Sequence, residues 1–165
     1  MRERLKHLSP AERRTRSLSI CTKLRPHFAG KKSIGLFAPM PTEPDLDLLW
    51  DLGLLKDHLT TYPRCAGETL AFHPVSKLTE LALGRFGIRE PVPGPKLEQL
   101  DIIVVPGLAF TVAGARVGRG AGYYDRYLAA VPRTTLKIGV CFEFQLCPGI
   151  TPEPHDVIMD FVVYA

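Results

Sequence analysis

Residues 100–107 read Leu-Asp-Ile-Ile-Val-Val-Pro-Gly, and this stretch decides the fold. Its first part is mostly apolar and rich in β-branched side chains, which favour extended backbone. Pro106 and Gly107 then end the run, because neither residue suits the interior of a central strand. A run of this kind is typical of a parallel strand buried on both faces. We therefore predict a central strand over Leu100–Val105.

The N-terminal part of the chain predicts a long helix. Ser9, Pro10 and Glu12 have the pattern of a capping box with proline in the first helical position. Pro26 can kink or end this helix, and otherwise Gly30 is its expected stop. Apolar residues recur every three or four positions and indicate a buried stripe: Leu18, Cys21, Leu24 and Phe28.

Shorter elements are expected on both sides of the central strand. A second helix is expected to begin near Pro44 and to end near Gly53, and a third to span residues 123–130. Residues 83–97 hold three Pro and three Gly and are expected to form a loop. Apolar runs predict further strands at residues 33–38, 58–62, 69–72, 136–142 and 157–163.

Strands that alternate with helices predict an α/β fold, here a three-layer α/β/α sandwich with a mostly parallel central sheet. A chain of 165 residues fits one domain, so residues 1–165 are expected to form a single unit. In such folds ligands bind beyond the carboxyl ends of the strands. The loops after Ala38, Val105 and Phe142 are therefore the expected walls of a site.

The composition is that of a globular protein, with 45% hydrophobic and 23% charged residues. No apolar run approaches the roughly 20 residues that cross a bilayer, and the charged N-terminus does not have the pattern of a secretory signal. We expect a cytoplasmic protein with no membrane partner. The four cysteines form no Cys-x-x-Cys pair, so reduced thiols are expected.

The net charge of +4 lies in the first sixteen residues, while the rest of the chain is neutral. This segment is either a solvated helix face or an attractor for an anionic ligand or nucleic acid. No basic surface interleaved with aromatic residues accompanies the charge, so we expect no nucleic-acid partner. The bases are Arg2, Arg4, Lys6, Arg13, Arg14 and Arg16.

Residues 116–126 carry the main candidate for chemistry, Arg-Val-Gly-Arg-Gly-Ala-Gly-Tyr-Tyr-Asp-Arg. Alternating glycines at 118, 120 and 122 let the backbone approach a ligand and direct N–H groups at it. The helix expected from Tyr123 would add the anion-binding character of a helix N-terminus. The spacing is neither that of a Walker A loop nor that of a dinucleotide fingerprint. A flexible turn is the alternative interpretation.

Acidic residues near this motif and near the first loop have two interpretations each. Asp125 is either a first-turn acid favoured by the helix dipole or a magnesium ligand, since magnesium takes one or two carboxylates plus phosphate oxygens and water. Asp156 is the candidate for a second carboxylate, and Asp160 is a weaker one. Glu43 either favours the start of a helix or accepts a hydrogen bond from a substrate N–H group.

Two aromatic residues can serve either a ligand or the core. Tyr123 and Phe110 can stack on a flat heterocycle, or they can pack in the interior. His155 is expected to be a surface loop residue.

These segments together resemble the 5-formyltetrahydrofolate cyclo-ligase family, in the same order and over nearly the whole chain. The long glycine motif is the most specific part. The segments that carry the resemblance are residues 8–13, Met40-Pro41-Thr42-Glu43, Phe86-Gly87-Ile88-Arg89-Glu90-Pro91, Val105 to Phe110 with Gly114, Arg116 to Arg126, Gln145-Leu146 and His155-Asp156-Val157.

The resemblance implies an ATP- and magnesium-dependent closure of 5-formyltetrahydrofolate to 5,10-methenyltetrahydrofolate, with release of ADP and phosphate. It also implies the family's α/β/α fold and roles for individual residues. ATP would be lined by Arg116, Val117, Gly118, Arg119, Gly120, Ala121, Gly122, Tyr123 and Tyr124. The folate would contact Ala38, Glu43, Arg119, Gly120, Ala121, Gly122 and Tyr123. Magnesium would be held by Asp125 and Asp156.

The chain departs from the family pattern in two places. Only eight residues precede Ser9, so the usual upstream Lys and Arg that touch ATP have no counterpart in register. Ala121 stands where relatives carry Gly or Lys, and Val117 replaces a usual Leu or Met. These departures keep a second interpretation open, a relative that binds nucleotide or folate with lost or altered ligase activity. We expect a monomer.

Overall fold

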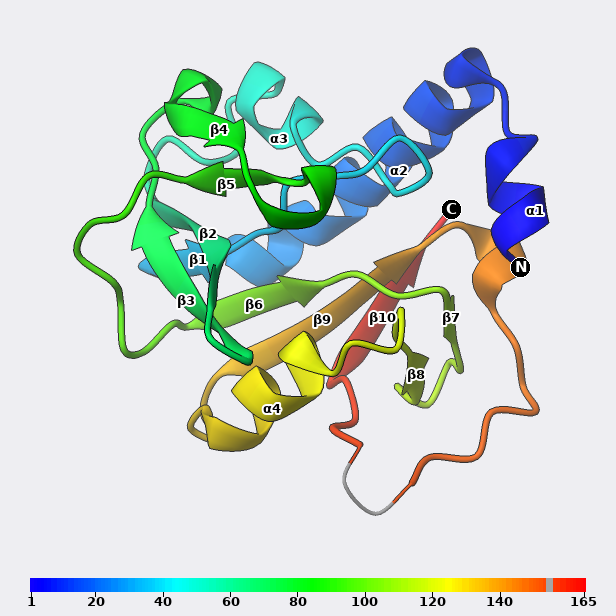
Figure 1. The fold of residues 1–165 in the computed structure, drawn as a ribbon. Helices are drawn as coiled ribbons and strands as arrows, with labels where there is room; N and C mark the ends of the chain where they lie inside the picture. The colour runs from blue at the N-terminus through cyan, green and yellow to red at the C-terminus, as the bar shows by residue number, and fades with distance from the viewer. Residues whose placement is uncertain (154–155) are drawn as a thin grey trace.

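The computed structural model describes residues 1–153 and 156–165, and a six-stranded sheet forms its centre (Figure 1). The strand order is β10-β9-β6-β1-β2-β3. All neighbours in this sheet are parallel except β2 and β3, which form an antiparallel hairpin. The strands are β1 (Ser33–Gly35), β2 (Leu59–Ala66), β3 (Thr69–Pro74), β6 (Ile102–Val105), β9 (Leu136–Cys141) and β10 (Phe161–Tyr164).

Strand β6 lies in the interior of the sheet and is buried on both faces, as its sequence predicts. It pairs with β1 on one side, where Ile34 lies opposite Ile102, and with β9 on the other. Successive side chains enter two separate apolar clusters, because side chains alternate across a strand. Ile102 and Val104 belong to one cluster, whereas Ile103 and Val105 belong to the other.

Helices cover both faces of the sheet, so the predicted α/β/α arrangement is confirmed (Figure 1). Helices α2 (Pro10–Phe28) and α3 (Leu48–Asp51) contribute to the cluster that contains Ile102. Helix α4 (Tyr123–Ala130) places Leu128 in the opposite cluster. A short N-terminal helix, α1 (Arg2–Lys6), was not expected from the sequence.

Helix α2 begins at the predicted capping box. The Ser9 hydroxyl accepts a hydrogen bond from the Glu12 N–H, and the Glu12 carboxylate accepts one from the Ser9 N–H. Pro26 lies inside the helix and does not end it. The helix ends at Phe28, shortly before Gly30, which adopts a φ of 72°.

Several predicted boundaries are wrong. The helix expected from Pro44 is the four-residue α3, which begins at Leu48, because residues before it bond to α2 instead of continuing a helix. Strand β1 ends at Gly35, and β10 begins at Phe161. Residues 83–97 are not all loop, since β4 (Leu81–Leu83) ends within them and β5 (Arg89–Pro91) pairs with it.

The remaining elements are short. A second small hairpin pairs β7 (Ala109–Phe110) with β8 (Arg116–Val117). Single 3-10 turns occupy Leu78–Glu80, Arg85–Gly87 and Glu143–Gln145. Within residues 1–153 and 156–165, none of the helices has the length and apolar character required to cross a membrane.

Candidate functional site

A cavity of about 380 Å³ opens beyond the carboxyl ends of β1 and β6. Segments that are distant in sequence build its wall: the residues after β1, the residues after β6, the β2–β3 hairpin, the β4–β5 hairpin and the glycine motif. Its lining residues are Phe37, Ala38, Met40, Glu43, Pro63, Cys65, Leu70, Phe86, Ile88, Glu90, Pro106, Gly107, Arg116, Gly118, Arg119, Ala121, Gly122, Tyr123, Tyr124 and Asp125.

Two of the three expected loops line this cavity, those after Ala38 and Val105. The loop after Phe142 does not, as far as its described residues go. Leu146 and Cys147 of that loop line a different cavity, together with Val112 and Ile158.

Two walls of the cavity were not expected from periodicity. Cys65 and Leu70 come from the β2–β3 hairpin, and Phe86 and Glu90 come from the β4–β5 hairpin. The only sequence signal for these walls was the resemblance of residues 86–91 to the cyclo-ligase family. No comparable signal marked the β2–β3 hairpin.

The glycine motif begins in β8 and ends in the first turn of α4. Gly120 and Gly122 have φ values of 98° and 67°, which non-glycine residues rarely adopt. Gly122 is also the N-cap of α4, and a Cβ there would lie 2.6 Å from the Arg126 side chain. Glycine is therefore strongly favoured at both positions, mainly because of these positive φ values. Because Tyr123 and Asp125 line the cavity, the first turn of α4 borders it.

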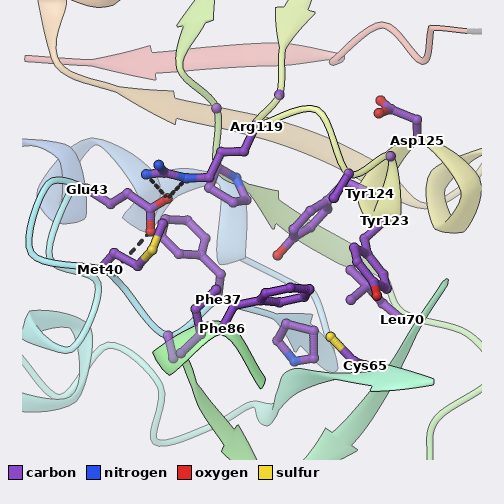
Figure 2. A pocket seen from close by; sticks show the side chains of 18 of the residues that line it. Phe37, Met40, Glu43, Cys65, Leu70, Phe86, Arg119, Tyr123, Tyr124 and Asp125 are labelled. Atoms are coloured by element: carbon purple, nitrogen blue, oxygen red, sulfur yellow. Dashed lines mark hydrogen bonds and ion pairs between the residues drawn. The ribbon is translucent and has the colours of Figure 1, made fainter. Parts of the chain in front are cut away.

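An ion pair between a buried carboxylate and an exposed guanidinium forms one end of the cavity (Figure 2). One Glu43 carboxylate oxygen accepts hydrogen bonds from Arg119 Nη2 at 2.9 Å and Nε at 3.2 Å. The other accepts the Met40 N–H at 3.0 Å. The Glu43 side chain is only 7% exposed, compared with 39% for Arg119. The structure thus brings together two predicted site residues that are 76 positions apart in the sequence.

A second ion pair joins Arg116 to Asp125. Arg116 Nη2 donates to Asp125 Oδ1, and Nη1 donates to the Pro106 carbonyl. The Arg116 side chain is 5% exposed, and its Nε has no partner within the described residues. Asp125 lies away from Glu43, on the far side of the two tyrosines (Figure 2). It keeps 30% of its side chain exposed, so a carboxylate oxygen remains accessible.

Aromatic rings line the cavity between these two ion pairs. The Tyr124 hydroxyl points into this space (Figure 2), is buried, and has no hydrogen-bond partner in residues 1–153 or 156–165. Burial raises the pKa of Tyr124 above its usual value, so the hydroxyl stays protonated and can donate to a ligand. The Tyr123 ring stands edge-on to Phe86, with centroids 6.1 Å apart. Phe110 is fully buried, so its core-packing interpretation is confirmed.

The structure separates a few expected residues from the cavity. Val117, Gly120 and Asp156 do not line it in the described chain. The Asp156 carboxylate accepts the Glu153 N–H at 2.8 Å. Asp160 binds the Lys137 N–H and ammonium, which gives it a structural role at the start of β10. His155 lies outside the described residues.

The four cysteines are free thiols, as expected. Burial raises the pKa of Cys65, the one thiol in the cavity wall, and this keeps it protonated. The neutral thiol and the ring-lined walls make much of the cavity apolar, and the buried Glu90 carboxylate also lines the wall.

Comparisons with known proteins give one consistent result. A family model described as "5-formyltetrahydrofolate cyclo-ligase family" matches residues 1–165. The mouse 5-formyltetrahydrofolate cyclo-ligase is 31% identical over 99% of this chain and 89% of its own length.

Two solved structures have the same fold. The NMR structure of 5,10-methenyltetrahydrofolate synthetase from Aquifex aeolicus superimposes with a TM-score of 0.86 at 34% identity, over 98% of this chain and 84% of that chain. The corresponding enzyme of Mycoplasma pneumoniae gives a TM-score of 0.78 at 25% identity, over 98% of this chain and 92% of that one. The chain belongs to the 5-formyltetrahydrofolate cyclo-ligase family.

Proposed function

We propose that this protein uses ATP to close 5-formyltetrahydrofolate to 5,10-methenyltetrahydrofolate, with release of ADP and phosphate. The observation that carries the proposal is the arrangement of the cavity. A buried carboxylate lies at one end, aromatic walls lie in the middle, and a glycine loop with a helix N-terminus borders the other side. The names of the relatives support the same reaction.

The folate would occupy the aromatic part of the cavity. A reduced pterin ring carries several N–H donors, and the Glu43 carboxylate is a buried acceptor for them. Ala38 and Tyr123 line the same space and can contact the ring faces. Arg119 would have to share or release Glu43 when this ligand binds. Gly120, Ala121 and Gly122 would border the folate from the loop.

ATP would lie along the glycine motif. Its phosphates would meet the backbone N–H groups of residues 118–122 and the first turn of α4, where free N–H groups and the helix dipole favour anions. Arg116 and Arg119 add positive charge on the same side. Val117, Tyr123 and Tyr124 complete the proposed nucleotide wall.

The donor set fits a magnesium ion that arrives with a nucleotide. Within residues 1–153 and 156–165, there is no cluster of three or more Asp, Glu, His or Cys side chains that could hold a metal ion by itself. Magnesium commonly uses one or two carboxylates and takes its other ligands from phosphates and water. Asp125, with an accessible oxygen beside the glycine loop, would be the main ligand. Asp156, which does not line the cavity in the described part of this structure, is the proposed second ligand. Bound there, magnesium would neutralise phosphate charge.

The proposed chemistry asks the protein mainly to position its two substrates. The formyl oxygen attacks the γ-phosphorus of ATP, and the bond to ADP breaks. N10 of the folate then attacks the formyl carbon and loses its proton. The carbon–oxygen bond breaks, and phosphate leaves with the former formyl oxygen. Aromatic walls exclude water from the intermediate, and the unpartnered Tyr124 hydroxyl can donate to an oxygen that gains charge.

The direct test is turnover by the purified protein with ATP, magnesium and 5-formyltetrahydrofolate. We expect the absorbance of the methenyl product to rise, with one ADP formed for each product molecule. Omission of either substrate should abolish the signal. Absence of product under these conditions, with folded protein, would contradict the proposal.

Asp125→Asn tests the metal role separately. Asparagine keeps an oxygen acceptor for Arg116 but removes the charge that a magnesium ligand supplies. We expect turnover to fall by roughly 100-fold or more and magnesium to be required at higher concentration. If the magnesium dependence stayed unchanged, Asp125 would not be a magnesium ligand, and its role would be limited to the ion pair with Arg116.

A second candidate is a relative that binds folate or nucleotide without closing the ring. Ala121 favours it, because this exposed wall residue supplies no cation to a phosphate. Binding and turnover measured separately distinguish the two. Tight binding of both ligands with no product would support the second candidate.

A further inference from the structure

One side chain of α2, Arg13, holds both ends of the turn that carries Glu43. The turn is closed by the Glu43 N–H, which donates to the Met40 carbonyl at 2.9 Å. Arg13 Nε donates to the Glu43 carbonyl at 2.8 Å, and Nη2 donates to the Met40 carbonyl at 3.4 Å. Nη1 lies 3.5 Å from the Asp45 carboxylate. All three guanidinium nitrogens are therefore engaged by this one loop.

Two more side chains on the same face of α2 form hydrogen bonds with this loop. Arg13, Ser17 and Cys21 are spaced by four residues and lie on one side of the helix. The buried Ser17 hydroxyl accepts the Asp45 N–H at 2.8 Å. Burial raises the pKa of Cys21 to about 12, so its thiol stays protonated and can donate to the Asp45 carbonyl at 3.7 Å. Side chains of α2 thus replace the helical hydrogen bonds that the loop lacks.

The start of α2 fixes where Arg13 stands. The Arg13 N–H donates to the Ser9 carbonyl at 2.9 Å in the turn closed by the capping box. Its side chain is 23% exposed, and it does not line the cavity in the described chain. With its donors directed at loop carbonyls and at Asp45, it is poorly placed to serve as a phosphate-binding cation.

We infer that Arg13 is a positioning residue that aims the Glu43 carboxylate at the N–H donors of the folate heterocycle. This inference rests on the proposed function. The turn between Met40 and Glu43 also supplies the Met40 N–H that orients one carboxylate oxygen. Loss of Arg13 would free the turn, and Glu43 would then reach the substrate in several orientations. The effect should fall on folate binding and spare the nucleotide.

Arg13→Gln is the first test, with Arg14→Gln as the matched control on the exposed side of the same helix. Dissociation constants are measured by calorimetry for 5-formyltetrahydrofolate alone and for magnesium–ATP alone. We expect folate affinity to fall about tenfold in the Arg13 variant, because hydrogen bonds to two carbonyls and a carboxylate contact are lost. ATP affinity should stay unchanged, and the Arg14 variant should match the wild type.

A double-mutant cycle with Glu43→Gln tests whether Arg13 acts through Glu43. If it does, Arg13→Gln should change folate affinity by less than about twofold once Glu43 has lost its charge. A merely structural role would give the same loss in both backgrounds and would overturn the inference. Equal losses of folate and ATP affinity would also overturn it.

If the Arg13 variant does not fold, Ser17→Ala is used to test the inference instead. It removes one loop contact from the same face and should weaken folate binding about threefold. Unchanged affinity in the folded Arg13 variant, or in Ser17→Ala when the Arg13 variant is unfolded, contradicts this inference alone. A wild-type protein that binds no 5-formyltetrahydrofolate contradicts the proposed function and the inference together.

Discussion

At the scale of single residues, the Glu43 carboxylate is a deeply enclosed charge in the cavity wall. Its side chain is 7% exposed and is satisfied by Arg119 and by the Met40 N–H. A buried charge that loses its partner is costly, so a ligand that displaces Arg119 must itself donate hydrogen bonds. The pair therefore selects for ligands with N–H donors at this end and disfavours purely apolar ones.

Ala121 provides a residue-scale prediction of increased affinity. It is exposed, lines the cavity and has no positive φ, so a longer side chain fits its backbone. Under the proposed function, Ala121→Lys should place an ammonium near the phosphates and lower the KM for ATP about fivefold, which corresponds to ~1 kcal/mol. Steady-state kinetics at low salt measure this change.

Ala121→Gln is the control, because it has similar length without charge. An equal change in both variants would show that contact area, and not charge, is responsible. The lysine effect should also decrease with added salt, since exposed charges are screened.

Individual site residues could be predicted from the sequence only where they belong to a recognisable motif. Arg119 and Asp125 lie in the glycine motif, and both line the cavity. The ion-pair partner of Arg119 could not be derived from spacing, because Glu43 lies 76 positions away in the sequence. The contacts of Arg13 could not be predicted either. A basic residue in the first turn of a helix gives the same sequence pattern whether its side chain is solvated or hydrogen-bonded to a loop.

At the scale of elements, Asp101 ties the start of β6 to the start of β1. Its carboxylate accepts the Lys32 N–H at 2.6 Å and the Ser33 N–H at 3.0 Å, while the Ser33 hydroxyl accepts the Asp101 N–H. The hydrogen bond from Lys32, followed by that from Ser33, holds the pKa of Asp101 below its usual value. The charged form therefore stabilises the folded state.

We expect Asp101→Asn to lower the free energy of unfolding by roughly 1 kcal/mol at pH 7, an estimate kept small because solvent screens the carboxylate. The pKa is depressed on folding, so this contribution is complete above the unfolded value of about 3.9 and is lost as pH falls through the folded value. Urea denaturation at pH 7 and pH 3.5 should show a smaller difference at the lower pH.

Asp57→Asn, at an exposed position, is the matched control and should leave stability unchanged at both pH values. An Asp101→Asn difference that does not shrink at low pH would mean that the carboxylate charge is not the source of the effect.

Long elements with clear patterns were predictable, and short ones were not. Helix α2 and strand β6 have a capping box and an uninterrupted apolar run, and both lie where expected. Strands β4 and β5 have three residues each and pair with one another, so no periodicity can mark them. The helix expected from Pro44 was overridden by tertiary hydrogen bonds from α2, which local sequence does not encode.

At the scale of the whole molecule, the two apolar clusters share the central sheet. Strand β6 contributes buried residues to both, so one strand joins the two clusters. We therefore predict one cooperative unfolding transition for residues 1–165. Fluorescence of Trp50, the single tryptophan, and far-UV circular dichroism should give the same urea midpoint. Two separated midpoints would indicate two domains.

The long sequence separations of contacts in and beside the cavity also have a consequence for folding kinetics. Glu43 meets Arg119 across 76 positions, and Arg126 reaches the Glu68 carbonyl across 58. Such contacts require closure of large chain loops, whose entropy cost delays them relative to local structure. The cavity should therefore be completed after the rate-limiting barrier. A bound ligand would then slow unfolding while leaving the rate of folding unchanged.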